Sequence, residues 1–525
     1  MVLLILHRAA GAFRARGPGR RLGSAARLSI LLAAAALAAC APLTPLERPA
    51  FADPSLRAEN GPLAVHGAAA EAWLDDGESA FWLLEDNADA LRIRIALAEL
   101  AVETLDIQYF IWQDDMTGRL LMKHVLEAAD RGVRVRFLID DLAVVGRHAE
   151  LESLNAHPRV EVRVFNPWRM RAPVLRPFEF VARIGRLNHR MHNKVLVADG
   201  RFAILGGRNI GDRYFGVYDE FVQNDVDLML AGALLDDVMA SFETFWSSEL
   251  SLPVGAGQGD ASMIRAACER AVAENAEMLA EFAPPPRGWD AYLADVVGTA
   301  TRGEGRLLLD SPDVHDGRPT QLYEHFKALL ASAEEDVIIS SPYLVPDREM
   351  IGLIDELVGR GVRVRIITNS LASNSHVIAH SAYKKWRRSL LGAGAEIYEM
   401  RADAPILERY RTPPATPKWL ALHTKAVVVD GRRSFVGSPN LDPRSMILNT
   451  EIGVIADDPE LAALLVRLFG RDMAPENSWR VTLEDGGWLK WWNGDDEHVG
   501  RQPAKGFQQR AVEFFLNLLP IKNQA

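Results

Sequence analysis

The sequence predicts an α/β protein made of two copies of one unit. Three observations support this fold class: a repeated strand segment, a repeated polar motif, and the same order of strands and helices in both halves of the chain. Residues 131–140 reappear as residues 360–369, and the first six residues are identical. The segment begins 61 residues before His192 in the first half and 63 residues before His423 in the second. Duplication and fusion of one unit explains this spacing.

Each half is expected to begin with a βαβ unit, because two short apolar runs flank a stretch with helical spacing of its apolar residues. In the first half the predicted strands are residues 105–112 and 133–139, with a helix over 119–130. In the second half the strands are 337–341 and 362–368, and the helix carries Ile354, Leu357 and Val358 at core spacing. Further strands are predicted at 160–165 and 395–400. Helices should cover both faces of each sheet.

The polar motif has the pattern His-x-Lys-x4-Asp. Its members are His192, Lys194 and Asp199 in the first half and His423, Lys425 and Asp430 in the second. A histidine and a lysine two residues apart on a strand point to the same face of the sheet. Two such strands together supply two imidazoles and two ammonium groups, a set suited to attack on a phosphodiester. A single copy would favour an ordinary surface strand, whereas two copies in register favour a catalytic site.

An Asp-Gly dipeptide follows each motif between two apolar runs, at residues 199–200 and 430–431, and predicts a two-residue hairpin turn. A turn centred there sets the register of the returning strand. The predicted opposite pairs are His192 with Gly207, Lys194 with Leu205, His423 with Ser438, and Lys425 with Val436.

Small residues opposite both histidines would leave room for a phosphate group to approach the backbone. Asn209 and Asn440 come just beyond these positions, and Ser438 adds a hydroxyl group in the second half. We therefore expect Asn209, Ser438 and Asn440 to bind the phosphate of the substrate.

The aspartates that complete the two motifs are predicted to be structural. Seven strand residues span roughly 23 Å at about 3.3 Å each, so Asp199 cannot readily reach His192. Asp199 and Asp430 are therefore interpreted as turn and hydrogen-bonding residues.

Each histidine still needs an acceptor that fixes its tautomer, and carboxylates on the strands after the motifs are the candidates. Glu451 is predicted to orient His423. For His192 the sequence offers both Asp225 and Asp227. Asp227 is preferred because it precedes Leu-Met-Leu much as Glu451 precedes Ile-Gly-Val.

The N-terminus predicts a lipid-anchored protein of the bacterial cell envelope. A basic segment precedes an apolar run, residues 28–39, that is too short to span a membrane. The run ends in Leu-Ala-Ala-Cys40, which resembles the bacterial lipoprotein signal, in which the cysteine is acylated and becomes the first residue. By the sorting rule of the lipoproteins that this signal resembles, Ala41 rather than aspartate after the cysteine implies the outer membrane over the inner membrane, with the protein facing the periplasm. The alternative is an uncleaved inner-membrane anchor.

Composition limits the remaining possibilities. If Cys40 carries lipid, Cys268 is the only other cysteine, so the mature chain has neither an intramolecular disulfide nor a cysteine-based metal site. Loss of six leader arginines, with no acidic residue among those removed, takes the formal charge from -11 to -17, which argues against a nucleic-acid partner. With 48% hydrophobic residues and 486 residues (525 - 39) after the leader, the chain is long enough for two ordinary domains.

The expected organisation is a leader at residues 1–39, a tether at 40–75, a first domain at 76–300, a second domain at 301–480 and a C-terminal extension at 481–525. Two basic clusters could guide anionic headgroups or could be ordinary solvated side chains. They comprise Arg169, Arg171, Arg176, Arg183, Arg186 and Arg190, and then Lys384, Lys385, Arg387 and Arg388. Apolar residues of the extension could meet a bilayer interface or pack between the halves; they are Trp488, Trp491, Trp492, Phe507, Phe514, Phe515 and Leu518.

The residues resemble the phospholipase D superfamily, whose pattern is His-x-Lys-x4-Asp-x6-Gly-Ser-x-Asn. The second copy matches it from His423 to Asn440, whereas the first copy has Gly207 where the pattern has serine. Three further segments look most like the class C bacterial cardiolipin synthases: residues 105–109, 190–194 and 519–521. The resemblance implies two duplicated α/β/α sandwich domains with the active site at their interface.

The resemblance also implies a mechanism. One histidine attacks phosphorus to give a phosphatidyl-histidine, and the other protonates the departing alcohol and later deprotonates the incoming one. By analogy His192 is the nucleophile and His423 the acid, although the near symmetry of the halves leaves the reverse open. Lysines and asparagines would stabilise the phosphate charge, so no metal and no nucleotide cofactor is expected.

The leading hypothesis is a phosphatidyltransferase of the cardiolipin synthase type, acting on anionic phospholipids such as phosphatidylglycerol at a membrane surface. The alternative is a phospholipase D or another phosphodiesterase that hydrolyses phospholipid or nucleic acid. An inactive lipid-binding protein is a third hypothesis, supported only by Gly207.

Overall fold

The computed structural model describes residues 56–168, 179, 184–255, 259–313, 317–494 and 497–518. All of these except Trp168 and Glu179 belong to one compact unit, formed by Leu46–Pro167 and Arg183–Ala525; the other unit is Met1–Pro45 with Trp168–Ala182. The predicted leader with Cys40, the arginines at 169, 171, 176 and 183, and the segment 519–521 lie outside the described residues. No helix in the described part of the chain combines the length and apolar character needed to cross a membrane.

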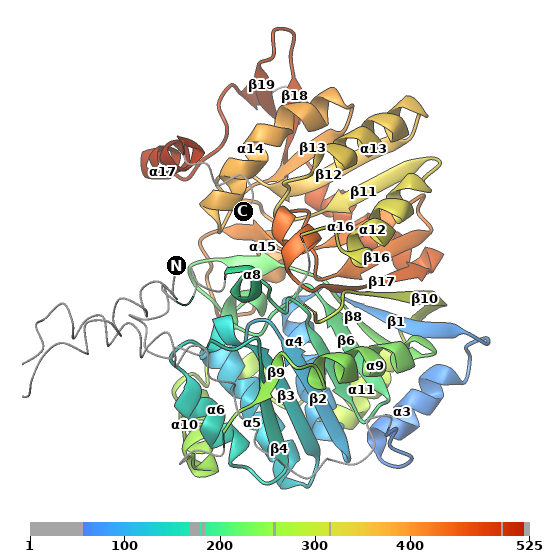
Figure 1. Cartoon of the computed structure of the whole chain (residues 1–525), viewed down its shortest axis with the longest axis vertical. Helices are drawn as coiled ribbons and strands as arrows, with labels where there is room; N and C mark the ends of the chain where they lie inside the picture. Colours follow the sequence, from blue (N-terminus) through green and yellow to red (C-terminus); the bar gives the residue numbers. More distant parts are fainter. Residues whose placement is uncertain are drawn as a thin grey trace, which may run out of the picture. The chain divides into compact units, whose positions relative to one another are not determined.

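The strands of both halves form one continuous sheet, in which the second half repeats the order of the first (Figure 1). The first-half order is β4 (Val160–Phe165), β3 (Arg134–Asp140), β2 (Thr104–Tyr109), β5 (Val195–Ala198), β6 (Phe202–Gly206), β8 (Asp227–Gly232) and β1 (Glu78–Leu84). The matching strands are β13 (Glu396–Met400), β12 (Arg363–Asn369), β11 (Asp336–Ser340), β15 (Ala426–Val429), β16 (Arg433–Gly437), β17 (Ile452–Asp457) and β10 (Thr301–Leu309). The halves join where β1 pairs antiparallel with β10.

Short strands extend the sheet at both ends. β9 (Ser251–Pro253) pairs with β4, and β18 (Ser478–Leu483), β19 (Leu489–Asn493) and β20 (Glu497–Val499) continue beyond β13. The described part of the C-terminal extension therefore contains strands of the sheet followed by α17 (Phe507–Leu518).

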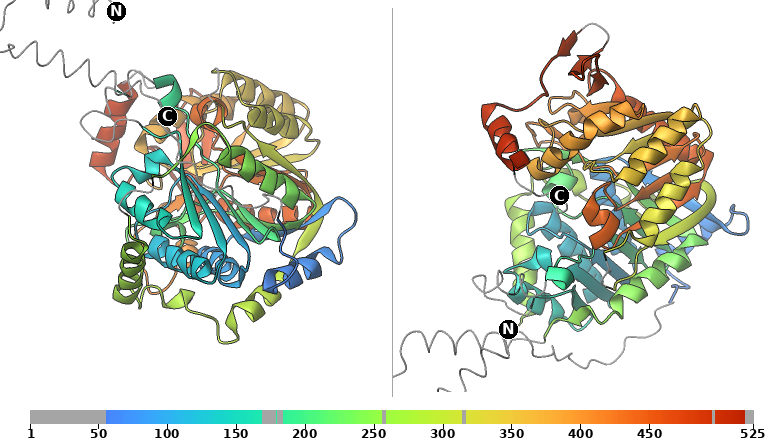
Figure 2. Two further views of the ribbon diagram at one scale, coloured as in Figure 1. Left: turned by 60° about the horizontal axis from the view of Figure 1, so that its bottom comes forward. Right: turned by 45° about the horizontal axis from the view of Figure 1, so that its top comes forward.

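Helices cover both faces of the sheet, as expected (Figures 1 and 2). Along β5, Leu196 and Ala198 join the core formed with α4 (Asn87–Leu100) and α5 (Met116–Asp130), whereas Val195 and Val197 join the core formed with α9 (Leu234–Trp246) and α16 (Pro459–Met473). In the second half α12 (Gln321–Ala331), α13 (Arg348–Gly359) and α14 (Val377–Gly392) pack on the outer face. The predicted α/β/α fold class is thus confirmed. Other helices are α3 (Pro62–Glu71), α6 (His148–Asn155), α10 (Ala261–Glu274) and α11 (Gly288–Val297).

The first crossover helix is longer than the sequence predicts. α5 begins at Met116, three residues before the predicted start, because Asp115 caps it: the Asp115 carboxylate accepts a hydrogen bond from the backbone N–H of Gly118 at 3.1 Å. The N-cap at Asp347 opens α13 in the same way, with Met350 as the donor.

Both Asp-Gly turns form, but the predicted register is wrong by one residue. Asp199 and Gly200 have φ of 52° and 58°, as a hairpin turn of this type requires, and Asp430 and Gly431 match them at 53° and 60°. One extra residue follows each turn, however, so Ala198 pairs with Phe202 and Val429 pairs with Arg433. Leu205 consequently faces Val195 rather than Lys194, and Val436 faces Ala426 rather than Lys425.

The turn aspartates hold the hairpins against the neighbouring strands. The Asp199 carboxylate accepts hydrogen bonds from the backbone N–H groups of Val102, Glu103 and Thr104, which lead into β2, at 2.9, 2.8 and 2.8 Å. Asp430 accepts from the three residues that lead into β11 in the equivalent way. Each motif aspartate therefore fixes where its hairpin meets the parallel strands.

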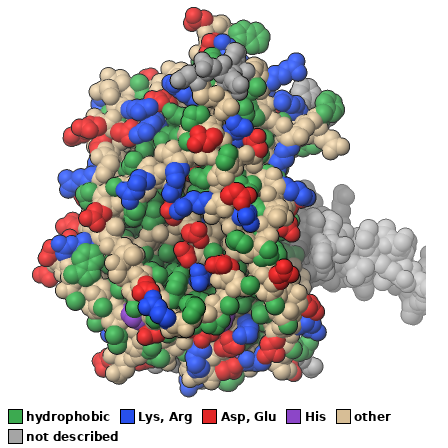
Figure 3. Space-filling view, turned by 180° about the vertical axis from the view of Figure 1, so that it is seen from behind, with side chains coloured by type: hydrophobic (Ala, Val, Ile, Leu, Met, Phe, Trp, Pro, Cys, Tyr) green, Lys and Arg blue, Asp and Glu red, His purple; other side chains and the backbone are tan. Residues whose placement is uncertain are grey.

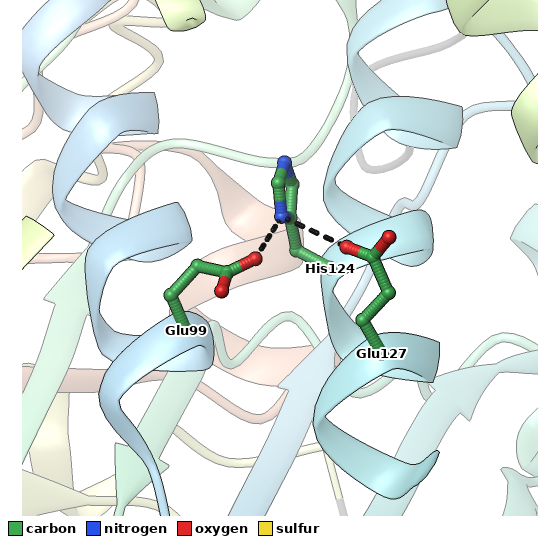
Figure 4. A group of neighbouring side chains, drawn as sticks. All are labelled: Glu99, His124 and Glu127. Carbon is green, nitrogen blue, oxygen red and sulfur yellow. Dashed lines mark hydrogen bonds and ion pairs between the residues drawn. The ribbon is translucent and has the colours of Figure 1, made fainter. Parts of the chain in front are cut away.

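A histidine and two glutamates connect α4 to α5 (Figure 4). His124 Nδ1 lies 2.5 Å from Glu99 and 3.4 Å from Glu127. Lys123 lies 2.6 Å from Glu127, and Arg131 lies 3.7 Å from Glu99, so each carboxylate also has a cationic neighbour. These contacts explain why the three side chains lie together: they belong to a cluster of acidic and basic groups that links two helices.

We predict that Asp199→Ala lowers the free energy of unfolding by roughly 2–4 kcal/mol, because it leaves three backbone donors without their acceptor in a buried place. Urea denaturation followed by circular dichroism measures the change. Asp430→Ala is the matched control: its turn is partly exposed, water can replace the carboxylate, and the loss should be smaller. Equal losses for the two variants would contradict this account.

Candidate active site

The two histidine-lysine pairs lie in the segments that lead into strands, not within the strands as predicted. His192 and Lys194 precede β5, and His423 and Lys425 precede β15. All four side chains are buried, with the histidines 8% and 6% exposed and the lysines 1% and 2% exposed. Each lysine folds back so that its ammonium group donates to the carbonyl of its own histidine.

Backbone contacts between the halves position both histidines. Met191 forms a parallel bridge with Thr450, and the His192 N–H donates to the Thr450 carbonyl at 2.9 Å. In the other half of the site, β7 (Val222–Asn224) pairs in parallel with β14 (Leu420–Leu422), and the His423 N–H donates to the Asn224 carbonyl at 2.8 Å. The site is therefore assembled from both halves.

The carboxylate partners of the histidines are exchanged between the halves. His192 Nδ1 lies 2.8 Å from Glu451 Oε2, and His423 Nδ1 is hydrogen-bonded to Asp225 Oδ2. The predicted pairings of Glu451 with His423 and of Asp227 with His192 are both wrong. The backbone explains why: the residues before His192 and Glu451 bridge each other, and so do the residues before His423 and Asp225.

Asp227 has a different place in the core. It pairs with β6 beside Gly206, the position that Gly453 holds beside Gly437 in the second half, so Asp225 is the true counterpart of Glu451. The Asp227 carboxylate lies 2.7 Å from both Arg94 and Arg208, and all three side chains are fully buried. The similarity of the apolar runs after Asp227 and Glu451 therefore predicted a counterpart two residues too far along the chain.

Ser438 and Gly207 mark a difference between the two carboxylates. Ser438 was predicted to face His423, but its hydroxyl donates to Glu451 Oε2, the oxygen that binds His192. A Cβ atom at residue 207 would overlap Asp225 Oδ1 and lie 3.1 Å from Oδ2. Gly207 thus leaves the space that the Asp225 carboxylate occupies.

The two predicted phosphate-binding asparagines differ in their surroundings. Asn209 donates from Nδ2 to the Tyr214 hydroxyl at 3.1 Å and accepts from the Ile111 N–H at 3.2 Å. Asn440 is buried, and its Oδ1 has no hydrogen-bond partner among the residues that the structure describes. A phosphate-binding role for Asn209, Ser438 and Asn440 remains a prediction.

Aromatic rings that the sequence analysis missed contact both histidines. The ring centroids of Phe110 and His192 lie 4.9 Å apart, and those of Tyr214 and His423 lie 5.4 Å apart, both edge to face. These rings shield the imidazoles from water. Neither aromatic residue belongs to a motif, so only the fold brings it to the site.

Most of the described basic residues of the two clusters form ion pairs or hydrogen bonds within the protein. Arg190 is buried, with its guanidinium 3.3 Å from Asp140, and Arg186 donates to the Pro167 carbonyl at 2.9 Å. In α14, Arg387 is buried beside Glu399 at 2.8 Å, and Lys384 pairs with Glu513 at 2.9 Å. Lys385 and Arg388 are exposed.

Comparison with known proteins places this geometry in a family. The family model described as "Cardiolipin synthase, PLD-like domain" matches residues 93–246 and 326–473, which together are more than half of the chain. The chain is 35% identical over 474 residues to "Cardiolipin synthase C" of Escherichia coli (strain K12), covering 85% of this chain and 96% of the relative. The chain belongs to this phospholipase D-like cardiolipin synthase family.

A second relative and a solved structure are also similar to this chain. "Cardiolipin synthase" of Geobacillus kaustophilus (strain HTA426) is 27% identical over 436 residues, covering 82% of this chain and 71% of the relative. The crystal structure of phosphatidylserine synthase from Haemophilus influenzae Rd KW20 superposes with a TM-score of 0.50 at 16% identity, covering 77% of this chain and 89% of that one. The latter similarity shows the shared fold.

Burial controls the charge of the reactive groups in this cardiolipin synthase-family site. Burial lowers the pKa of His192 to about 4, against the opposing effect of Glu451, and holds the pKa of His423 well below its usual range. Burial also lowers the pKa of Lys194 to about 7 and that of Lys425 to about 8. Both imidazoles are therefore neutral at neutral pH, so one of them can act as a nucleophile.

The carboxylates respond differently to burial. Burial by itself would raise the pKa of Glu451, but His192 and Lys194 bring it below its usual value. Burial raises the pKa of Asp225, and Lys425 opposes that rise. An arriving phosphodiester anion favours protonation of a histidine, which would supply the general acid.

We predict that kcat/KM falls as the pH rises through about 7 to 8, because the ammonium groups of Lys194 and Lys425 lose their protons there. Lys194→Arg keeps a cation at higher pH and should move this fall upward, even if the maximal rate is lower. Rate profiles between pH 5 and 10 measure the shift. Lys385→Arg, at an exposed position on α14, should leave the profile unchanged. An unchanged profile for Lys194→Arg would refute this assignment.

We predict that Gly207→Ser lowers kcat roughly 10- to 100-fold, because the new Cβ displaces the Asp225 carboxylate that orients His423. The double variant Gly207→Ser with Asp225→Glu reproduces the Ser438 and Glu451 arrangement of the other half and should recover part of the loss. Thermal unfolding of each variant separates this effect from misfolding. Wild-type turnover by Gly207→Ser would show that the glycine does not matter for positioning.

Proposed function

We propose that the protein forms cardiolipin by transferring a phosphatidyl group from one phosphatidylglycerol to another, with release of glycerol. The observation that carries this proposal is the pair of buried histidines, each oriented through Nδ1 by a carboxylate from the other half and flanked by a lysine. Because Nδ1 of each ring is occupied, Nε2 is left for reaction. Family membership supports a lipid phosphodiester as the substrate.

The proposed reaction has two steps. Nε2 of His192 attacks phosphorus, the bond from phosphorus to the glycerol headgroup oxygen breaks, and His423 donates a proton to that oxygen. In the second step His423 removes a proton from a hydroxyl of the acceptor phosphatidylglycerol, whose oxygen attacks phosphorus while the bond to His192 breaks. Each step exchanges one phosphorus ester or amide bond for another, so the reaction needs no nucleotide.

Lys194 and Lys425 would stabilise the nonbridging phosphate oxygens as negative charge grows in the transition state. Both ammonium groups lie beside their histidines, and Asp225 and Glu451 are among the acids that favour their charged forms. Two lysine side chains of this chain would therefore supply the positive charge that a metal ion supplies in other phosphoryl-transfer enzymes.

A membrane surface is the proposed working environment. A lipid on Cys40 would hold the protein at the envelope, with the outer membrane favoured. In the C-terminal extension Trp488 and Phe507 are 74% and 84% exposed, whereas Trp491 is packed at 4%. Exposed aromatic side chains favour the interface of a bilayer. The face in Figure 3 mixes acidic and basic side chains without a broad basic surface, which disfavours a nucleic-acid substrate there.

We predict that purified full-length protein converts phosphatidylglycerol to cardiolipin and glycerol in the presence of a metal chelator. The physical reason is that the lysines supply the charge stabilisation and the ester exchange needs no external energy. Lipid mass spectrometry measures the products. His192→Ala and His423→Ala should each abolish turnover. Phosphatidic acid as the sole product would show that water is the acceptor and that the protein is a hydrolase.

A further inference from the structure

A cavity of about 410 Å3 lies at the carboxyl ends of the parallel strands β2 and β3. Five of its eight lining residues are apolar and come from the segments that follow these strands: Phe110, Ile111 and Trp112 after β2, and Leu142 and Ala143 after β3. The other three are Gln113, Asp114 and Arg147. Ligands of α/β proteins bind beyond the carboxyl ends of parallel strands, and this volume falls in the usual range of ligand cavities.

Phe110 connects this cavity to the catalytic centre. Phe110 is one of the residues that line the cavity, and its ring lies edge to face with His192, with the ring centroids 4.9 Å apart. The Lys194 ammonium group is 5.5 Å from the centroid of the same ring. A molecule whose phosphorus is bound at His192 can therefore extend past Phe110 into the cavity.

The charged groups at the cavity are already neutralised. Asp114 is paired with Arg119, and Arg147 is paired with Glu150 at 2.6 Å while it donates to the Trp112 carbonyl at 2.8 Å. The cavity thus offers little attraction to an anionic headgroup. The protein surface beside the cavity also carries exposed apolar side chains, since Leu142 and the neighbouring Val145 are 46% and 43% exposed.

We propose that this cavity holds one fatty acyl chain of the phospholipid that reacts at His192. The proposal rests on the proposed function, since it requires a phospholipid substrate, and it adds where that substrate's apolar part binds. Burial of methylene groups against Phe110, Ile111 and Leu142 would supply binding energy remote from phosphorus and fix the orientation of the phosphate.

The second half differs at the matching place. Trp112 bridges Ile210, the residue after Asn209, and Leu344 bridges Leu441, the residue after Asn440, so the two segments correspond. The second segment carries Tyr343, whose hydroxyl lies 2.7 Å from His376 Nδ1. A polar pair therefore stands in the second half where the first half has an apolar wall, and the acyl site is assigned to the first half.

The experiment is photocrosslinking of full-length protein with phosphatidylglycerol that carries a diazirine in one acyl chain. Peptide mass spectrometry should locate the label on residues 110–114 or 142–147, and excess unlabelled phosphatidylglycerol should suppress it. Labelling confined to other segments would overturn the proposal. The label map does not depend on whether the product is cardiolipin or phosphatidic acid, so failure of this proposal and failure of the proposed function are distinguishable.

A variant that fills the cavity tests the same point by turnover. Ala143 is partly exposed, so Ala143→Trp can fill the cavity without entering the core. It should reduce kcat/KM for dioleoyl-phosphatidylglycerol at least about tenfold, the equivalent of roughly two buried methylene groups, and should spare dibutanoyl-phosphatidylglycerol. Val65→Trp, at an exposed position on α3, is the matched control and should affect neither substrate. Equal loss with both lipids, or loss with neither, would contradict an acyl-chain site.

Discussion

The exchange of carboxylates between the halves is the interaction on which the site depends. Glu451 of the second half orients His192 of the first, and Asp225 of the first half orients His423 of the second. Neither half can therefore complete a reactive histidine alone. The pairing of β1 with β10 and the backbone contacts of Met191 with Thr450 and β7 with β14 exist at the same junction, so the fold and the chemistry share one interface.

Burial of the charged catalytic side chains at this junction would cost much free energy if no opposite charges lay beside them. Two lysines, two histidines and two carboxylates are all buried there, and Asp227, two residues after Asp225, forms ion pairs with Arg94 and Arg208. The acids favour the charged lysines, while burial keeps the histidines neutral. The lowered pKa values of both imidazoles and both ammonium groups are thus consequences of burial, which removes the side chains from water.

The sequence predicted those features that local spacing or repetition encodes. The duplicated strand order, the helices on both faces and the positive φ of both Asp-Gly turns follow from periodicity and turn chemistry. The predicted strand register was wrong because the pattern of apolar and polar residues does not reveal the one extra residue after each turn. The predicted carboxylate partners of the histidines were wrong because contacts between the two halves determine them. Met191 bridges Thr450, and Leu422 pairs with Asn224, so each contact joins residues some 200 or more positions apart. Periodicity within one half cannot reveal such contacts.

Duplication has produced two solutions to one geometric problem. The short Asp225 side chain reaches His423 through space that Gly207 leaves empty, whereas the longer Glu451 reaches His192 and is fixed by the Ser438 hydroxyl. The departure from the serine pattern therefore argues for adjustment of a working site rather than for its loss. The same asymmetry extends outward: the ring of Phe110, a residue that also lines the cavity beyond β2 and β3, contacts His192, while the ring of Tyr214 contacts His423. In the proposed reaction one phosphatidylglycerol presents its phosphodiester and the other a headgroup hydroxyl, so the two unlike sides of the duplicated site would contact different groups of the same lipid.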